Sequence, residues 1–173
     1  MRNMMDLQKS VEQFLYRKAD LCDRREWVDY LELFDENSEF HIPQWDSEHV
    51  YTTDPKRGMS LMYYANRAGL EDRVYRLGTG KSSASMPLPR TLHMISNVAI
   101  QEVSDSQLEA RAKWVTYAHR FGATTSFHGD ATYRLKPVGF SWVILRKHVV
   151  IHNDTATSPR SVIVARKKIS GGP

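Results

Sequence analysis

The sequence contains a single cysteine, Cys22, among its 173 residues. A disulfide needs two thiols, so no disulfide framework can form within the chain, and this cysteine usage is typical of a reducing cytoplasm. A Rieske-type iron–sulfur cluster needs two cysteines and two histidines. The chain therefore lacks the ligands to hold such a cluster by itself.

Long hydrophobic runs are also missing from the sequence. No apolar stretch approaches the roughly 20 residues that span a bilayer. Asp6, Lys9 and Glu12 interrupt the amino-terminal segment where a signal peptide would have its apolar core. We therefore expect no membrane partner and a cytoplasmic location.

An excess of charge of one sign is present but modest. The formal net charge is +4 and the isoelectric point is about 9.2. Much of the excess lies in residues 160–168, whereas basic and acidic residues alternate in stretches such as 20–29. Nucleic-acid-binding surfaces collect basic residues on one face or stripe, so we expect no nucleic-acid partner.

The composition, 41% apolar and 25% charged, is that of an ordinary globular protein, and the length suits one domain spanning residues 1–173. Apolar residues between positions 7 and 22 recur near helical spacing and predict an amphipathic helix over the first twenty residues. The pattern Asp23-x-x-Glu26 resembles a capping box and predicts a second helix. The apolar face of that helix would consist of Trp27, Tyr30, Leu31 and Phe34.

Shorter elements and then long alternating runs follow these helices. Phe40 and Ile42 predict a strand that ends at Pro43, and a long loop, a brief strand or helix start at 61–64 and a charged helix at 69–77 come next. After residue 90, turns separate the alternating runs 95–103, 107–121, 124–136 and 140–151. These runs predict an antiparallel meander. Helices first and strands afterwards predict an α+β fold, with amino-terminal helices packed on a curved antiparallel sheet.

The seven histidines raise the possibility of a metal site. His41, Asp46 and His49 lie within one loop and could fold back around an ion. His148 and His152 share a strand face, but at about 3.3 Å per residue their Cα atoms lie roughly 13 Å apart, too far for one ion. Ordinary loop and sheet histidines are the favoured interpretation.

Acid–base catalysis is a second possibility. Cone-shaped α+β domains often enclose a pocket, and Tyr30 together with His41 or His93 would supply proton-transferring groups in a stand-alone dehydratase or isomerase. Asp29 and His119 are further candidates. Alternatively, Tyr30 packs in an aromatic core and the histidines make ordinary hydrogen bonds, or the pocket binds a ligand without chemistry.

Four segments, in their order and spacing, carry a family resemblance. They are FLYRKADLCDRREWVDYLELF at 14–34, SEFHIPQWDSEH at 38–49, TDPKRGMSLMYYANRAGLEDRVYRL at 53–77 and PLPRTLHMISNV at 87–98. The sequence resembles the small (beta) subunit of bacterial aromatic-ring-hydroxylating dioxygenases over residues 14–154. Within that family it is most similar to the branch acting on anthranilate and benzoate.

The resemblance implies a cone-like fold, shared with nuclear transport factor, ketosteroid isomerase and cystatin. It implies a non-catalytic subunit without catalytic, metal or cofactor-binding residues of its own. The partner large (alpha) subunit would carry the Rieske [2Fe–2S] cluster and the mononuclear iron, and a reductase would supply electrons from NADH. The small subunits would form a trimer within a three-plus-three hexamer that dihydroxylates an aromatic carboxylate.

A three-fold core needs one surface patch that closes into a ring and a second patch for the large subunit. Aromatic and arginine side chains are enriched at such contacts. The interface candidates are Trp45, Tyr63, Tyr64, Arg67, Glu71, Asp72, Arg73 and Arg90. Alternatively, Tyr63 and Tyr64 pack in the core, while residues 71–73 form a solvated helix face.

The carboxyl terminus departs from the family pattern. Members of the family tend to end on an apolar, aromatic-ended strand that completes the sheet. Residues 161–165 predict a strand here, but the basic residues 166–168 and the final Gly-Gly-Pro are unusual. The resemblance therefore predicts the last strand least well.

Overall fold

The computed structural model of the chain describes residues 3–80, 86–104 and 106–154. The helices are α1 (Met4–Arg24), α2 (Trp27–Glu32) and α3 (Ala68–Gly78). The strands are β1 (Phe34–Pro43), β2 (Ser60–Tyr64), β3 (Arg90–Ser104), β4 (Gln107–Arg120), β5 (Ala123–Val138) and β6 (Ser141–Ile151). The predicted strand at 161–165 lies outside the described residues.

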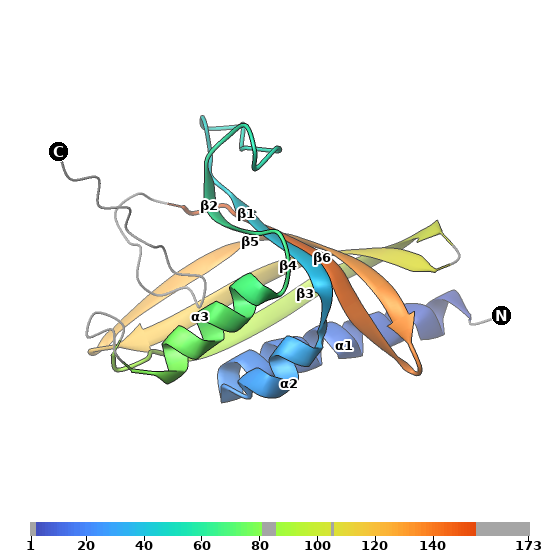
Figure 1. Ribbon diagram of the computed structural model, residues 1–173, viewed down its shortest axis with the longest axis horizontal. Coiled ribbons are helices and arrows are strands. Elements are labelled where there is room, and N and C mark those ends of the chain that lie inside the picture. The colour runs from blue at the N-terminus through green and yellow to red at the C-terminus, as the bar shows by residue number, and fades with distance from the viewer. Residues whose placement is uncertain (1–2, 81–85, 105, 155–173) are drawn as a thin grey trace.

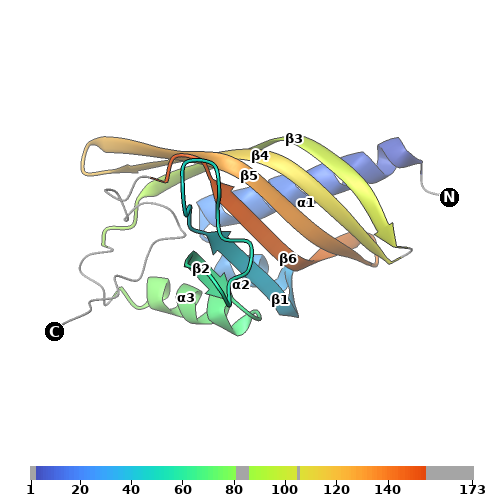
Figure 2. The same cartoon turned by 90° about the horizontal axis from the view of Figure 1, so that it is seen from above.

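The strands form one strongly curved sheet in the order β2-β1-β6-β5-β4-β3 (Figure 1). β3 to β6 pair antiparallel with their chain neighbours, which confirms the predicted meander. β1 pairs parallel with β6 and antiparallel with β2, and the segment at 61–64 is therefore a strand. α1 runs along one face of the sheet, while α2 and α3 lie near β1 and β2 (Figure 2). The predicted α+β class is confirmed.

α1 forms because its apolar residues recur every three or four positions and bury one stripe against the sheet. Leu7, Val11, Phe14 and Leu15 belong to this stripe and to the main hydrophobic core. The side chain of Asn3 caps the amino terminus by accepting a hydrogen bond from the backbone N–H of Met5. No helix in the described ranges is long and apolar enough to cross a membrane.

The predicted capping box at Asp23 and Glu26 is wrong, although the second helix exists. Asp23 still belongs to α1, and its carboxylate accepts hydrogen bonds from β3. Glu26 precedes α2 but makes no side-chain cap hydrogen bond. α2 is only six residues long, and Phe34 already starts β1. The first helix extends past Asp23, so this carboxylate faces the sheet instead of the next helix.

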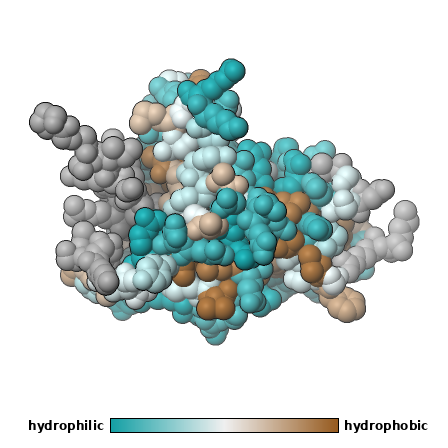
Figure 3. Space-filling model, in the orientation of Figure 1, coloured by the Kyte–Doolittle hydropathy of each residue, from teal (hydrophilic) through white to brown (hydrophobic). Residues whose placement is uncertain are grey.

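The surface seen in the orientation of Figure 1 is mainly hydrophilic, with hydrophobic residues in a few small groups (Figure 3). The core lies between the helices and the concave face of the sheet, where Tyr133, Leu135 and Ile144 are almost inaccessible to solvent. This packing leaves a cavity between the helices and the sheet.

Candidate functional site

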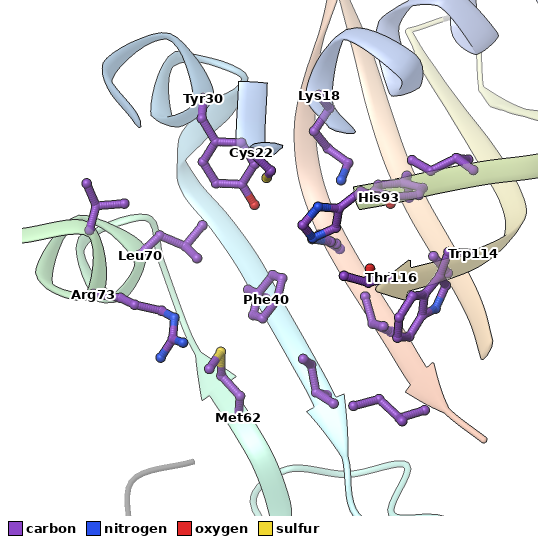
Figure 4. A pocket seen from close by; sticks show the side chains of 18 of the residues that line it. Lys18, Cys22, Tyr30, Phe40, Met62, Leu70, Arg73, His93, Trp114 and Thr116 are labelled. Atoms are coloured by element: carbon purple, nitrogen blue, oxygen red, sulfur yellow. The ribbon is translucent and has the colours of Figure 1, made fainter. Parts of the chain in front are cut away.

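A cavity of about 70 Å³ lies between the three helices and the sheet, and every strand contributes to its wall. Most of the wall is apolar, as expected for a ligand pocket. The apolar and aromatic lining includes Phe40, Ile42, Met62, Leu70, Trp114 and Val149. Figure 4 shows Lys18, Tyr30 and His93 pointing into the same space from α1, α2 and β3.

Two lysines are the most unusual groups in this cavity. Lys18 and Lys147 are only 5% and 8% exposed, and both line the wall. The Nζ of Lys18 lies 5.6 Å from the ring centroid of Tyr133, and that of Lys147 lies 4.7 Å from the ring centroid of Phe40. These are cation–π distances. Aromatic faces thus partly replace the water that each ammonium group loses.

Local structure turns both lysines inward. Lys18 follows Phe14 by one helical turn and precedes Cys22 by another, so it lies on the buried stripe of α1. In β6, Arg146 pairs with Arg134 while Ile144 pairs with Leu135, which leaves an extra residue between them. Such a bulge reverses the alternation, and Lys147 therefore faces the cavity, as Ile144 faces the core.

The two lysines differ in their electrostatics. Burial and the charge of Lys18 hold the pKa of Lys147 well below its usual value. Burial lowers the pKa of Lys18 too, but attraction to Tyr133 and Cys22 outweighs it, and the net shift is upward. Burial raises the pKa of the Cys22 thiol. The opposite shifts make Lys147 the more easily deprotonated of the two lysines.

His93 forms another part of the wall and pairs with a carboxylate that does not itself line the cavity. The Nδ1 of His93 lies 2.6 Å from the Oδ1 of Asp23, and the backbone N–H of His93 donates to the other carboxylate oxygen. Burial raises the pKa of Asp23, but the hydrogen bonds from His93 and Thr91 outweigh it and bring that pKa below its ordinary value. Burial lowers the pKa of His93, with Asp23 opposing the shift.

The structure brings together one of the two predicted acid–base pairs. Tyr30 and His93 both line the cavity, and burial raises the pKa of Tyr30 well above its ordinary value. His41 is absent from the wall. Its Nε2 lies 2.9 Å from the Oγ of Ser60, and its ring lies 5.2 Å from that of His148. The combination of Tyr30 with His41 is therefore wrong.

The predicted metal groups do not converge. Asp46 accepts a hydrogen bond from Thr52, whereas His41 contacts Ser60 and His148. His152 lies 2.6 Å from a carboxylate oxygen of Asp130. Across the part of the chain that the structure describes, no three His, Cys, Asp or Glu side chains are placed to hold a metal ion.

The other acid–base candidates lie away from the cavity. Asp29 is exposed on α2. The Nδ1 of His119 lies 2.7 Å from the Oγ1 of Thr124, near the β4–β5 turn. Neither residue lines the cavity wall.

Several predicted interface residues make contacts within the chain. Trp45 donates its Nε1–H to the carbonyl of Ile151. Tyr64 stacks on Phe40 with ring centroids 6.1 Å apart. Arg67 donates to Glu71 and to a β1 carbonyl.

The remaining candidates divide between the cavity, the inner contacts and the surface. Arg73 lines the cavity. Tyr63 packs edge-on against His41, and Asp72 and Arg90 are exposed.

Sequence reasoning missed the two cavity lysines, although their positions carried a signal. A lysine at position 18 interrupts an otherwise apolar helix stripe, and a lysine at 147 lies between the apolar segments 142–145 and 149–151. It also missed an outer β3–β4 patch, which consists of Leu92, Met94 and Tyr117. Leu92 pairs directly with Tyr117, so these two side chains lie on the same face of the sheet.

Comparison with known proteins shows the family. The model of the ring-hydroxylating beta-subunit family matches residues 17–158. The anthranilate 1,2-dioxygenase small subunit of Acinetobacter baylyi is 47% identical over 154 residues, which cover 89% of this chain and 94% of that protein.

Comparison with solved structures agrees. The beta subunit of the benzoate 1,2-dioxygenase from Burkholderia mallei matches with a TM-score of 0.74 and 32% identity, covering 91% of this chain and 96% of that one. An NTF2-like protein with a cystatin-like fold from Novosphingobium aromaticivorans matches with a TM-score of 0.59 and 14% identity, covering 90% and 94%. That likeness confirms the predicted cone-like fold. The chain belongs to the ring-hydroxylating dioxygenase beta-subunit family.

Proposed function

We propose that the chain is the structural, non-catalytic small subunit of a dioxygenase that dihydroxylates an aromatic carboxylate of the anthranilate or benzoate kind in aromatic-compound catabolism. The observation that carries this proposal is the 47% identity to an anthranilate 1,2-dioxygenase small subunit along 89% of the chain. A relative with this identity over nearly the full length supports the same role in the same type of complex.

The redox groups of such a complex would belong to the large subunit. The only cysteine, Cys22, is buried on the apolar stripe of α1, and burial raises its pKa, whereas an iron ligand must be a thiolate. The residues present therefore do not fit a Rieske cluster. Under the proposal, the partner holds the [2Fe–2S] cluster and the mononuclear iron, and a reductase delivers electrons from NADH.

The proposed assembly is a trimer of this chain within a three-plus-three hexamer. It would use exposed groups among the interface candidates, such as Asp72 and Arg90. The outer β3–β4 patch adds apolar surface beside Arg90, because Leu92 and Met94 are each 52% exposed. Exposed apolar groups beside an arginine are typical of subunit contacts.

Co-expression with the large subunit tests the proposal. The large subunit would be encoded next to this chain and recognised by its C-x-H and C-x-x-H pairs. We expect a brown, high-mass complex that oxidises anthranilate or benzoate, and a colourless, inactive chain when this subunit is purified alone. Stoichiometric, tightly bound iron in the isolated chain would contradict the proposal.

A stand-alone pocket enzyme is the second candidate, favoured by Tyr30 and His93 in one cavity and by the pairing of His93 with Asp23. It would predict turnover of a small substrate by the purified chain alone. Replacing the phenol through Tyr30→Phe would then abolish that activity. Loss of activity in Tyr30→Phe would favour this candidate over the structural role.

A further inference from the structure

The cavity concentrates basic and hydrogen-bonding groups without a balancing carboxylate. Lys18, Lys147 and Arg73 line it together with His93 and Tyr30, and no aspartate or glutamate occurs among the described wall residues. Asp23 contacts the wall residue His93, but three hydrogen bonds from Thr91 and His93 already engage its carboxylate. The wall is therefore suited to an anion.

Burying two amines is costly without a partner of opposite charge. Transfer of an ammonium group from water into a protein interior costs several kcal/mol unless it is paired. The ion pairs found between described residues include Lys113 but neither cavity lysine. Packing alone does not require amines at positions 18 and 147, because methionine has a similar length and costs no desolvation.

The rest of the wall restricts the shape of the anion. Phe40, Met62 and Trp114 add apolar surface to the wall, and all three lie lower than Lys18 in the view of Figure 4. A volume of about 70 Å³ corresponds to roughly five water molecules when each needs about 10–15 Å³. The space thus favours a compact molecule with one charged end and one apolar end over a nucleotide or another extended polyanion.

We propose that this cavity binds a small organic carboxylate, with the carboxylate group held by Lys18 and Lys147 and the apolar body against Phe40, Met62 and Trp114. The site lies on the small subunit itself, so it is additional to the dioxygenase role proposed above and needs no redox group. It is a binding site without chemistry.

Anion binding at this site should change the protonation state of Lys147. A carboxylate beside Lys147 favours the charged form of that lysine, whose pKa is otherwise depressed by burial and by Lys18. Carboxylate binding should therefore be accompanied by net proton uptake from the buffer. An apolar ligand held only by the hydrophobic wall would take up none.

Isothermal titration calorimetry on the full chain with benzoate tests the site. We expect saturable one-to-one binding, and a binding enthalpy that changes with the ionisation enthalpy of the buffer in proportion to the proton uptake. Benzamide, which has nearly the same shape but no charge, should bind at least about tenfold more weakly, because charge-assisted hydrogen bonds are lost. Inorganic phosphate, which lacks an apolar body, should also bind more weakly.

Variants locate the site. Lys147→Met and Lys18→Met should each weaken benzoate binding by about tenfold or more, and Lys147→Met should abolish the proton uptake. Lys136→Met removes an exposed lysine of the β5 strand and should change neither quantity. Circular dichroism melting of each variant establishes that the fold is intact.

Three results would overturn the proposal. One is the absence of benzoate binding to the wild-type chain at millimolar concentration. Another is equal affinity for benzamide or for inorganic phosphate, each measured on the wild type and so independent of how the variants fold. The third is unchanged benzoate affinity and proton uptake in a folded Lys147→Met chain. None of these results depends on iron content or dioxygenase activity. The proposal of a carboxylate site can therefore be contradicted without contradicting the proposed subunit role.

Discussion

Gly129 lies in β5 at a point where the backbone of β6 approaches very closely. A Cβ added at this position would overlap the carbonyl oxygen of Val150, which cannot move without breaking the β5–β6 ladder. We expect Gly129→Ala to lower the free energy of unfolding by about 1–3 kcal/mol. Urea denaturation measures the loss. Gly78→Ala, where nothing lies within 4 Å of the added Cβ, should leave stability unchanged or raise it slightly.

His148 makes the folded chain sensitive to mild acid. Burial and the positive influence of His41 lower its pKa to about 4. The unfolded chain binds this proton near pH 6.5, so between pH 6.5 and 4 the unfolded state holds more protons and stability falls as the pH falls. The pKa values of His41 and His93 are also lowered and contribute in the same direction.

Replacing this histidine should flatten the pH dependence. After a discount for partial exposure, the contribution of His148 is about 2 kcal/mol. We expect the stability difference between pH 6.5 and pH 4 to shrink by about that amount in His148→Gln, measured by urea denaturation at both pH values. An unchanged difference would mean that His148 titrates normally. The carboxylates Asp23 and Asp130 have lowered pKa values, so their effects appear mainly below this pH window.

At the scale of elements, Asp23 connects the end of α1 to β3. Its carboxylate accepts hydrogen bonds from the hydroxyl of Thr91 and from both the backbone and the ring of His93. We expect Asp23→Ala to reduce stability by about 1–3 kcal/mol, because it leaves partly buried donors without a partner. Chemical denaturation at pH 7 measures this.

Asp20, three residues before Asp23, provides a matched control. Asp20 is on the same helix, and its only ion pair in the described chain is with the exposed Arg24 at 3.0 Å. Exposed pairs of this kind contribute little, so Asp20→Ala should change stability by less than about 0.5 kcal/mol. Equal losses in the two variants would argue against a role for the connection to β3.

The elements that sequence periodicity predicts are those with one buried face. α1 and the meander β3–β6 follow from apolar spacing and from short turns. The parallel pairing of β1 with β6 does not, because the two strands are about 100 residues apart and no local pattern encodes their contact. The bulge that turns Lys147 inward cannot be predicted from the sequence either. A single extra residue in β6 reverses which side chains face the core, but it leaves the amino-acid composition of the strand unchanged.

The candidate site was predictable only in part. Tyr30 and His93 were identified because their side chains are common acid–base groups, and both line the cavity. Lys18 and Lys147 were not, because a lysine is expected on a surface unless a tertiary fold encloses it. The interface candidates Trp45 and Tyr64 turn part of their surface toward internal partners, which spacing alone cannot reveal.

At the scale of the whole molecule, the cavity and most of the outer β3–β4 patch lie on opposite faces of the same strands. His93 and Thr116 line the cavity, whereas their sequence neighbours Leu92 and Tyr117 are 52% and 43% exposed. Successive residues of a strand point to opposite faces. Met94 is the exception, because it belongs to the patch and also lines the cavity. A ligand in the cavity and a subunit on the patch would therefore share only this residue of the patch.

The outer β3–β4 patch should decide assembly and not folding. Leu92→Lys places a charge in an apolar contact, so we expect it to weaken association with the co-expressed large subunit by about tenfold or more, seen as loss of the high-mass peak in size-exclusion chromatography. The isolated variant should melt like the wild type, because Leu92 is half exposed in the free chain. Phe140→Lys, at the 97% exposed tip of the β5–β6 turn, is the matched control and should assemble normally. If Leu92→Lys assembles as well as Phe140→Lys does, the subunit contacts lie elsewhere on the molecule.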